Sequence, residues 1–242
     1  DVRWLYDFAY RQKIDLTIVG PEDALTAGLV DFFQKRDLPI FGPSRMAARI
    51  ESWKPFAKRL MRNVGIPTAP FRVFRNQNQA RYFIRTHGIP IVIKAAGLAG
   101  GKGVYVCRTF AEAEYALDEL MVKFKYGGAG REVVIEDFIG GQELSAHAFC
   151  DRKGNISLFP FSQDHKSIFD DDKGPNTGGM GTHAPYVPFR LSADGISQKV
   201  KSEIIQPALS CLAGLGHPFI GCLYPGLMIM RNGSLVALEF NA

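Results

Sequence analysis

The feature that most constrains the fold of this chain is a glycine-rich loop between two predicted strands. Apolar, β-branched runs predict strands over 90–95 and 103–107. A P-loop requires Gly-x-x-x-x-Gly-Lys-Ser/Thr at the start of a helix, but only three residues separate Gly97 from Gly101, and a glycine follows Lys102. The dinucleotide-binding pattern Gly-x-Gly-x-x-Gly fails in its spacing and also needs a helix. The sequence therefore predicts a glycine-rich flap that joins two strands.

The composition of this flap suits phosphate binding. Glycines let backbone N–H groups approach a phosphate closely, and Gly100, Gly101 and Gly103 would shape such a surface. Lys94, at the end of the first strand, would place a compact positive charge beside the phosphates. Lys102 would either touch the terminal phosphate in a closed flap or face solvent. The alternative is a passive hairpin tip with no ligand.

A second polar cluster follows the apolar run Val-Val-Ile. Glu136 and Asp137 end this predicted strand, and the chain then turns at a Gly-Gly pair. Backbone groups at such a strand exit can bind an adenine base, and Phe138 and Ile139 would form an apolar wall beside it. Glu143 could accept hydrogen bonds from ribose hydroxyls. A solvated strand end would explain the same residues without a ligand.

A third cluster lies near the C-terminal end of the sequence. Glu239 and Asn241 are two residues apart on a predicted strand, so their side chains point to the same face. Two oxygen ligands on one face, completed by phosphate oxygens, are typical of Mg²⁺ sites. The alternative is a polar pair at a strand end.

The rest of the pattern predicts a mixed α/β protein. Residues 14–20, 23–37 and 38–44 are expected to form a strand, a helix capped by Asp23, and a strand, which is typical of a βαβ unit on a parallel sheet. Residues 164–188, rich in Gly, Pro and Asp, predict a long functional loop. Further helices are expected over 44–65 (broken near Pro55), 77–88, 109–121 and 192–216, and further strands over 71–74, 131–139, 143–151, 155–162, 221–230 and 234–242.

The composition favours small phosphorylated ligands over membranes and nucleic acids. Hydrophobic residues make up 46% of the 242 residues and charged residues 22%, as in ordinary globular proteins. The net charge of +5 suits a protein that handles phosphorylated molecules. A nucleic-acid-binding module is the alternative, but the basic residues form no block typical of one. No apolar run approaches the ~18 residues of a membrane span.

The four cysteines indicate neither a disulfide framework nor a zinc site. No Cys-x-x-Cys pair occurs, and His147 and Cys150 form an isolated His-x-x-Cys. A structural zinc site needs about four converging ligands. Reduced thiols and a cytoplasmic location are therefore expected.

Seven motifs in this order resemble one family. The segments "DLTIVGPE", "KAAGLAGGKGV", "VVIEDFIGGQE", "SQDHK", "GPNTGGMG", "YPGLMI" and "LEFN" look like the phosphoribosylamine–glycine ligase family of the ATP-grasp superfamily, from about Asp15 to Asn241. The resemblance implies an ATP-grasp fold with two α+β lobes, preceded by the remainder of a βαβ domain. The implied boundaries are 1–50 for the N-terminal part, 51–242 for the ATP-grasp domain, about 67–137 for its flap lobe and about 138–242 for its larger lobe.

The same resemblance implies an activity. The family uses ATP to convert glycine into glycyl phosphate, which the amine of 5-phosphoribosylamine attacks to give glycinamide ribonucleotide, the second step of de novo purine biosynthesis. No protein nucleophile is required, and Mg²⁺ or Mn²⁺ is the expected metal. The implied sites are Lys54, Lys94, Lys102 and the flap glycines for phosphates, Glu239 and Asn241 for the metal, and Asp164, His165, Lys166, Asn176, Thr177, Gly178 and Gly179 for substrate positioning.

Three departures and the two ends of the sequence limit this resemblance. Ala96 replaces the family's usual Asp, Ser167 its usual Arg, and Pro225 its usual Ala. Both ends look cut, so the sequence is expected to be part of a longer protein and to be inactive as an isolated piece. The alternatives are another ATP-grasp carboxylate–amine ligase and a nucleotide-binding piece without catalysis.

Overall fold

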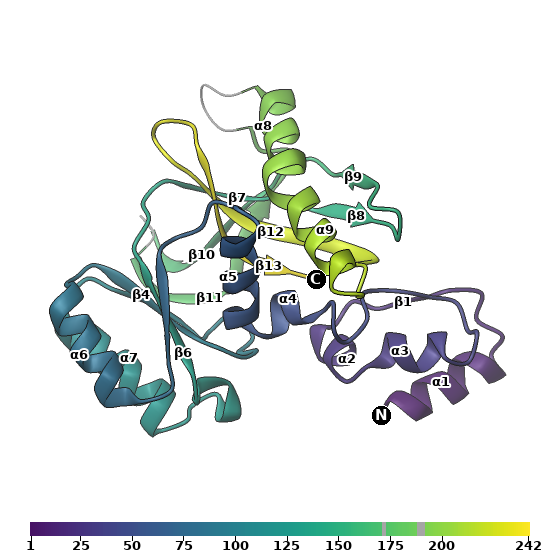
Figure 1. The fold of residues 1–242 in the computed structure, drawn as a ribbon, viewed down its shortest axis with the longest axis horizontal. Coiled ribbons are helices and arrows are strands. Elements are labelled where there is room, and N and C mark those ends of the chain that lie inside the picture. The colour runs from purple at the N-terminus through teal and green to yellow at the C-terminus, as the bar shows by residue number, and fades with distance from the viewer. Residues whose placement is uncertain (171–172, 188–191) are drawn as a thin grey trace.

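The computed structural model describes residues 1–170, 173–187 and 192–242. Figure 1 shows an N-terminal group of helices at the lower right, a small lobe at the left, and a larger lobe above and between them. Helices and strands are mixed in all three parts, which confirms the predicted α/β class. Within the described ranges, no helix is both long enough and apolar enough to cross a membrane.

The N-terminal part contains the predicted parallel strand pair. β1 and β2 pair in parallel, with Thr17 opposite Ile40. The helix expected between them is two helices, because Gly28 adopts a φ of +82° between α2 and α3, a conformation that favours glycine. α2 has no side-chain cap, so the expected capping role of Asp23 is wrong. The elements are α1 (Val2–Arg11), β1 (Thr17–Ile18), α2 (Glu22–Thr26), α3 (Leu29–Gln34) and β2 (Ile40–Phe41).

Two helices lead from this part into the lobes. α4 (Arg49–Ser52) and α5 (Lys54–Asn63) are separated at Trp53, whose backbone is extended. Pro55 lies in the first turn of α5, where its missing N–H would have no partner in the helix. The predicted break near Pro55 is therefore confirmed.

The small lobe is a four-stranded antiparallel sheet with helices on one face. Its strand order is β3–β6–β4–β5. α6 and α7 pack against one face, over a core that includes Ile91, Ile93 and Ile135. The elements are β3 (Phe71–Phe74), α6 (Gln77–His87), β4 (Ile91–Ala95), β5 (Val104–Cys107), α7 (Phe110–Leu117), the short helical turns η1 (Asp118–Val122) and η2 (Gly127–Gly130), and β6 (Val133–Asp137).

The opposite face of this sheet carries charged residues. Successive side chains on a strand alternate between faces, so Lys94 lies on the face opposite to its apolar neighbours Ile93 and Ala95. Val134 pairs with Lys94 and Glu136 with Val92, which places both charged side chains on the same face. This face lines the cleft between the lobes.

The larger lobe is built around β12. This strand pairs with β13, β7 and β8, and β9 extends the sheet beyond β8. A continuous helical rod of α8, η3 and α9 lies across the lobe (Figure 1) and buries residues such as Ile204 and Leu209 in its core. The elements are β7 (Gln142–Ser145), β8 (Ala148–Cys150), β9 (Ile156–Leu158), β10 (Gln163–Phe169), β11 (Lys173–His183), α8 (Ala193–Lys199), η3 (Val200–Ile205), α9 (Gln206–Gly214), β12 (Gly221–Ile229) and β13 (Leu235–Asn241).

Two predictions for this lobe are wrong. The strand expected over 143–151 is interrupted between β7 and β8, which both pair with the longer β12. The loop expected over 164–188 is largely an antiparallel hairpin, with Asp164 opposite Thr182 and His165 opposite Gly181. Glycine and aspartate are depleted in strands, so local composition indicated a loop, whereas the backbone hydrogen bonds between β10 and β11 do not depend on side chains.

Candidate active site

A cavity of about 470 Å³ lies where the flap, the small-lobe sheet and the larger lobe meet. This volume is within the range typical of small-molecule sites. Val92, Val104 and Val106 form an apolar wall on the small-lobe sheet. Most of the residues predicted from sequence line the cavity: Lys54, Lys94, Gly100, Gly101, Gly103, Glu136, Asp137, Phe138, Ile139, Glu143, Asp164, Lys166, Thr177, Glu239 and Asn241.

A buried cluster of two lysines and one glutamate forms the floor of this cavity. Lys58 Nζ and Lys94 Nζ each lie 3.0 Å from Glu136 Oε2. Lys58 is 2% exposed, Lys94 5% and Glu136 3%. Lys58 also donates to Thr68 Oγ1 at 2.7 Å, and Lys94 donates to the carbonyl of Leu238 at 3.3 Å. The cluster has two cations for one anion, so it favours an anionic ligand.

The sequence did not predict this cluster. The place of Glu136 at a nucleotide-binding strand exit stays a prediction, and its Oε2 is also the counter-ion of two lysines. Its Oε1 is buried without a hydrogen-bond partner in the described part of the chain. Lys58 was not predicted at all. The apolar spacing of α5 could have placed it on the buried side of that helix, but its charge indicated the surface.

Burial and the surrounding charges shift several pKa values in the site. Burial lowers the pKa of Lys58 to about 8, although Glu136 opposes this shift. Burial also lowers the pKa of Lys54. Burial would lower the pKa of Lys94 as well, but Glu136 and Glu239 raise it above its ordinary value. Burial acts to raise the pKa of Glu239, and the surrounding lysines reverse this and hold it below its usual range.

The predicted metal ligands lie together at the end of β13. Glu239 is opposite Gly226 and Asn241 is opposite Tyr224 in the β12–β13 pair, and both line the cavity. The Asn241 amide nitrogen donates to the carbonyl of Tyr224 at 3.3 Å, which leaves the amide oxygen as the available ligand atom. A carboxylate and an amide oxygen fit a hard divalent cation. No group of three or more His, Cys, Asp or Glu suited to a metal occurs among the described residues.

Glu51 is a second cavity residue that the sequence did not reveal. Its Oε2 accepts a hydrogen bond from the backbone N–H of Ala242 at 2.9 Å, directly after Asn241. Burial raises the pKa of Glu51 to about 7, and nearby Glu22 and Glu239 act in the same direction. The only signal in the sequence was its position three residues before Lys54.

The hairpin of β10 and β11 supplies part of the predicted substrate side. Asp164, Lys166 and Thr177 line the cavity. Thr182 donates to Asp164 Oδ1 at 3.2 Å, and Thr177 donates to the carbonyl of Lys166 at 2.9 Å. Gly179 lies close to the same carboxylate, because a Cβ on it would be 3.0 Å from Asp164 Oδ1.

Three predicted residues that the structure describes, His165, Lys102 and Gly179, are not among those that line the cavity. His165 is exposed and stacks on His183 with ring centroids 5.9 Å apart. The Lys102 side chain is exposed at the tip of the flap. The side chains of Asn176 and Ser167, and the surroundings of Gly178, lie outside what the structure describes.

Asp137 and Phe138, at the end of β6, contact side chains of the small lobe. Asp137 Oδ1 lies 2.7 Å from His87 Nε2, and the guanidinium of Arg108 lies 5.0 Å from the centroid of the Phe138 ring. These contacts hold the segment after β6 against the small lobe.

A cleft between two α+β lobes, with a glycine-rich flap from one lobe and lysines below it, defines an ATP-grasp domain. Biotin carboxylase from Campylobacter jejuni has the same fold, with a TM-score of 0.75 at 19% identity over 100% of this chain and 51% of the other. The chain itself belongs to the phosphoribosylglycinamide synthetase family: the model of the family's N domain matches residues 1–51, and that of its ATP-grasp (A) domain matches residues 52–242.

Individual relatives agree with this assignment. Phosphoribosylamine–glycine ligase of Ralstonia nicotianae is 45% identical over 241 residues, which cover 100% of this chain and 56% of that protein. The enzyme of the same name from Halalkalibacterium halodurans is 46% identical over 98% of this chain and 54% of that protein. The crystal structure of the Thermotoga maritima enzyme gives a TM-score of 0.79 at 35% identity, over 93% of this chain and 54% of the other. The chain thus spans about half the length of these relatives.

Proposed function

We propose that the cleft binds ATP with a divalent cation and uses it to activate the carboxylate of glycine for attack by 5-phosphoribosylamine. The observation that carries this proposal is the arrangement of buried charge. Lys58, Lys94 and Glu136 form a buried cluster in the cavity with two cations for one anion, and Glu239 and Asn241, which line the same cavity, would supply oxygen ligands. A metal-bound triphosphate requires both environments at once.

The residues of the cavity suggest how each part of ATP would be held. The valines of the small-lobe sheet, with Phe138 and Ile139, would contact the adenine. Lys54 and Lys94 would contact phosphates, and the flap glycines would cover them. Glu239 and Asn241 would hold Mg²⁺ or Mn²⁺. When bound, the metal neutralises charge on the transferred phosphoryl group.

On the substrate side, Asp164 would bind the ammonium group of glycine. The carboxylate of Asp164 accepts a hydrogen bond from Thr182, and Asp164 lines the cavity together with Lys166. A glycine carboxylate oxygen would attack the γ-phosphorus, with ADP leaving. The amine nitrogen of phosphoribosylamine would then attack the acyl carbon and release phosphate, and the amine loses a proton. Catalysis of this kind depends on positioning and electrostatics and needs no protein nucleophile.

Titration calorimetry with ATP, in the presence and absence of Mg²⁺, tests the binding step. We expect binding that depends on Mg²⁺ and weakens in a Lys94→Met variant. Lys201→Met is the matched control, since Lys201 lies in η3 and is not among the residues that line the cavity. Binding that is the same for both variants would contradict the proposed site.

Release of ADP with glycine and phosphoribosylamine tests the reaction. Faster release with another amino acid would favour a different carboxylate–amine ligase, which is the alternative within the superfamily. ATP binding without release of ADP under any of these conditions would favour a chain that binds nucleotide but does not catalyse the reaction alone. Salt-dependent binding to RNA or DNA, with no affinity for ATP, would favour the nucleic-acid alternative. The cytoplasmic location stays a prediction.

A further inference from the structure

The tip of the glycine flap is held by a side chain from a different part of the small lobe. The Tyr126 hydroxyl donates a hydrogen bond of 2.8 Å to the backbone carbonyl of Lys102. Lys102 lies at the flap tip, where its own N–H donates to the carbonyl of Ala99 at 3.1 Å. Because Gly100 and Gly101 between them have φ values of +56° and +74°, the tip is a defined turn rather than an extended loop.

Nearer its base, the flap is held by backbone hydrogen bonds to the segment 126–132. The N–H of Ala96 donates to the carbonyl of Glu132 at 3.0 Å, and the N–H of Gly97 donates to the carbonyl of Ala129 at 3.2 Å. A Cβ on Gly97 would be 3.0 Å from Ala129, so a glycine lets these two segments approach closely. The segment 126–132 therefore supports the flap from its base to its tip, and Tyr126 makes the contact farthest along it.

Tyr126 is itself fixed in place. Its ring packs against the core between the small-lobe sheet and its helices. The preceding Lys125 donates its backbone N–H to the carbonyl of Glu119 at 3.0 Å, and its ammonium lies 2.7 Å from Glu119 Oε2. The hydroxyl of this packed ring therefore limits the motion of the flap tip through the carbonyl of Lys102.

The held position is the one in which the flap lines the nucleotide cavity. Gly100 and Gly101 at the tip and Gly103 beyond it are all part of the cavity wall. A loop that must be ordered when a ligand binds loses conformational entropy, and a loop that is already ordered loses less. The hydrogen bond from Tyr126 would therefore favour nucleotide binding without touching the nucleotide.

We propose that Tyr126 is a positioning residue for the triphosphate site, which holds the glycine flap against the cavity through the carbonyl of Lys102. The part of this proposal that concerns nucleotide binding rests on the proposed function. The part that concerns the flap does not depend on it. Tyr126→Phe removes the hydroxyl and keeps the ring. It therefore separates the effect of the hydrogen bond to Lys102 from the effect of ring packing.

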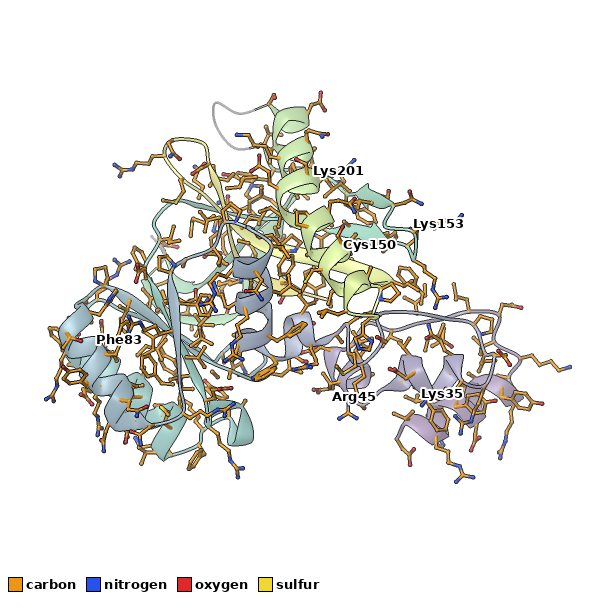
Figure 2. The ribbon with its side chains drawn as sticks, in the orientation of Figure 1. Lys35, Arg45, Phe83, Cys150, Lys153 and Lys201 are labelled. Carbon is orange, nitrogen blue, oxygen red and sulfur yellow. The ribbon has the colours of Figure 1, made fainter. Side chains whose placement is uncertain are left out.

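Limited trypsin digestion tests the flap directly, because Lys102 is itself a cleavage site at its tip. Cleavage of a folded protein follows the population of its open state when opening is fast. In Tyr126→Phe, without nucleotide, we expect cleavage after Lys102 to be about twofold to tenfold faster, as the loss of one neutral hydrogen bond implies. Cleavage after Lys153, at the exposed turn between β8 and β9 (Figure 2), provides an internal reference within each sample.

Tyr82→Phe is the matched control. Tyr82 lies on α6 of the same lobe and is 72% exposed. The Tyr82→Phe substitution should change neither the rate of cleavage after Lys102 nor the affinity for Mg-ATP. The midpoint of thermal unfolding, measured for each variant, identifies any general loss of stability.

Calorimetry with Mg-ATP completes the test. We expect Tyr126→Phe to weaken binding by a similar twofold to tenfold. Equal rates of cleavage at Lys102 in wild type and Tyr126→Phe would overturn the proposal. Faster cleavage with unchanged affinity would overturn its positioning role. Faster cleavage in a protein whose wild type binds no Mg-ATP would support the hold on the flap and overturn the proposed function instead.

Discussion

Lys58 Nζ lies 3.0 Å from Glu136 Oε2, and neither side chain is more than 3% exposed. Lys58 comes from α5 and Glu136 from β6, and Lys94 of β4 lies at the same distance from the same oxygen. A charge in this position cannot be solvated by water, so it depends on its partners.

Glu136→Gln should therefore destabilise the protein strongly. The amide keeps the size of the side chain but leaves Lys58 without its carboxylate partner and Lys94 dependent on other carboxylates such as Glu239, and removing one member of a buried pair costs roughly 3–5 kcal/mol. Glu114→Gln is the control, since Glu114 pairs with Arg81 at the surface, where such pairs contribute about 0–1 kcal/mol. Urea unfolding of both variants measures the difference, and similar free energies of unfolding would contradict the importance of this cluster.

Glu51 should make stability depend on pH. Its pKa is about 7 in the folded protein and 4.5 in the reference state, so the folded state binds the extra proton between these values. Stability from this group is fully present below pH ~4.5 and is lost as the pH rises through ~7. Because the group is partly solvated, the expected loss is about 1–3 kcal/mol.

Glu51→Gln should remove this dependence, since the amide oxygen can still accept from Ala242. We would measure the free energy of unfolding of both proteins from pH 4 to 8, in the presence of a chelator. The free energy of the variant should increase relative to that of the wild type as the pH rises. A constant difference across this range would show that Glu51 is not the group that titrates.

Glu239→Gln should weaken the binding of Mg-ATP. Substitution of residues that only support metal ligands already costs about tenfold to a hundredfold in metal affinity, so we expect a loss of at least about tenfold. Glu203→Gln, on the exposed side of η3, should have no effect. Calorimetric titration of Mg-ATP into each variant measures the two affinities. Unchanged affinity in Glu239→Gln would exclude this carboxylate as a ligand.

Gly103→Ala should disturb the flap through packing alone. A Cβ at this position would lie 2.7 Å from the Cβ of Ala99 and 3.0 Å from that of Ala95. Relief of such an overlap costs about 1–3 kcal/mol, so the flap should move and Mg-ATP binding should weaken. Gly214→Ala in α9 meets no atom within 4 Å and should leave binding unchanged. Equal affinities for the two variants would contradict the role of the flap.

The sequence by itself determined those features that depend on neighbouring residues. Thr109 and Glu112 form a capping box at the start of α7, and both of its hydrogen bonds lie within one turn of helix. The flap between two strands followed from glycine spacing, and Glu239 and Asn241 share a cavity because residues two apart on a strand face the same way. Motif order indicated the family, which the matched family models confirm.

Only the tertiary structure decided which distant residues meet. Lys58 and Lys94, 36 positions apart, share one carboxylate because α5, which packs in the core of the larger lobe, brings Lys58 to Glu136 of β6. The hairpin of β10 and β11 and the hold of Tyr126 on Lys102 likewise depend on partners that lie far along the chain. Local propensity carries no information about these contacts, because their free energy arises from burial and pairing that exist only after the chain has folded.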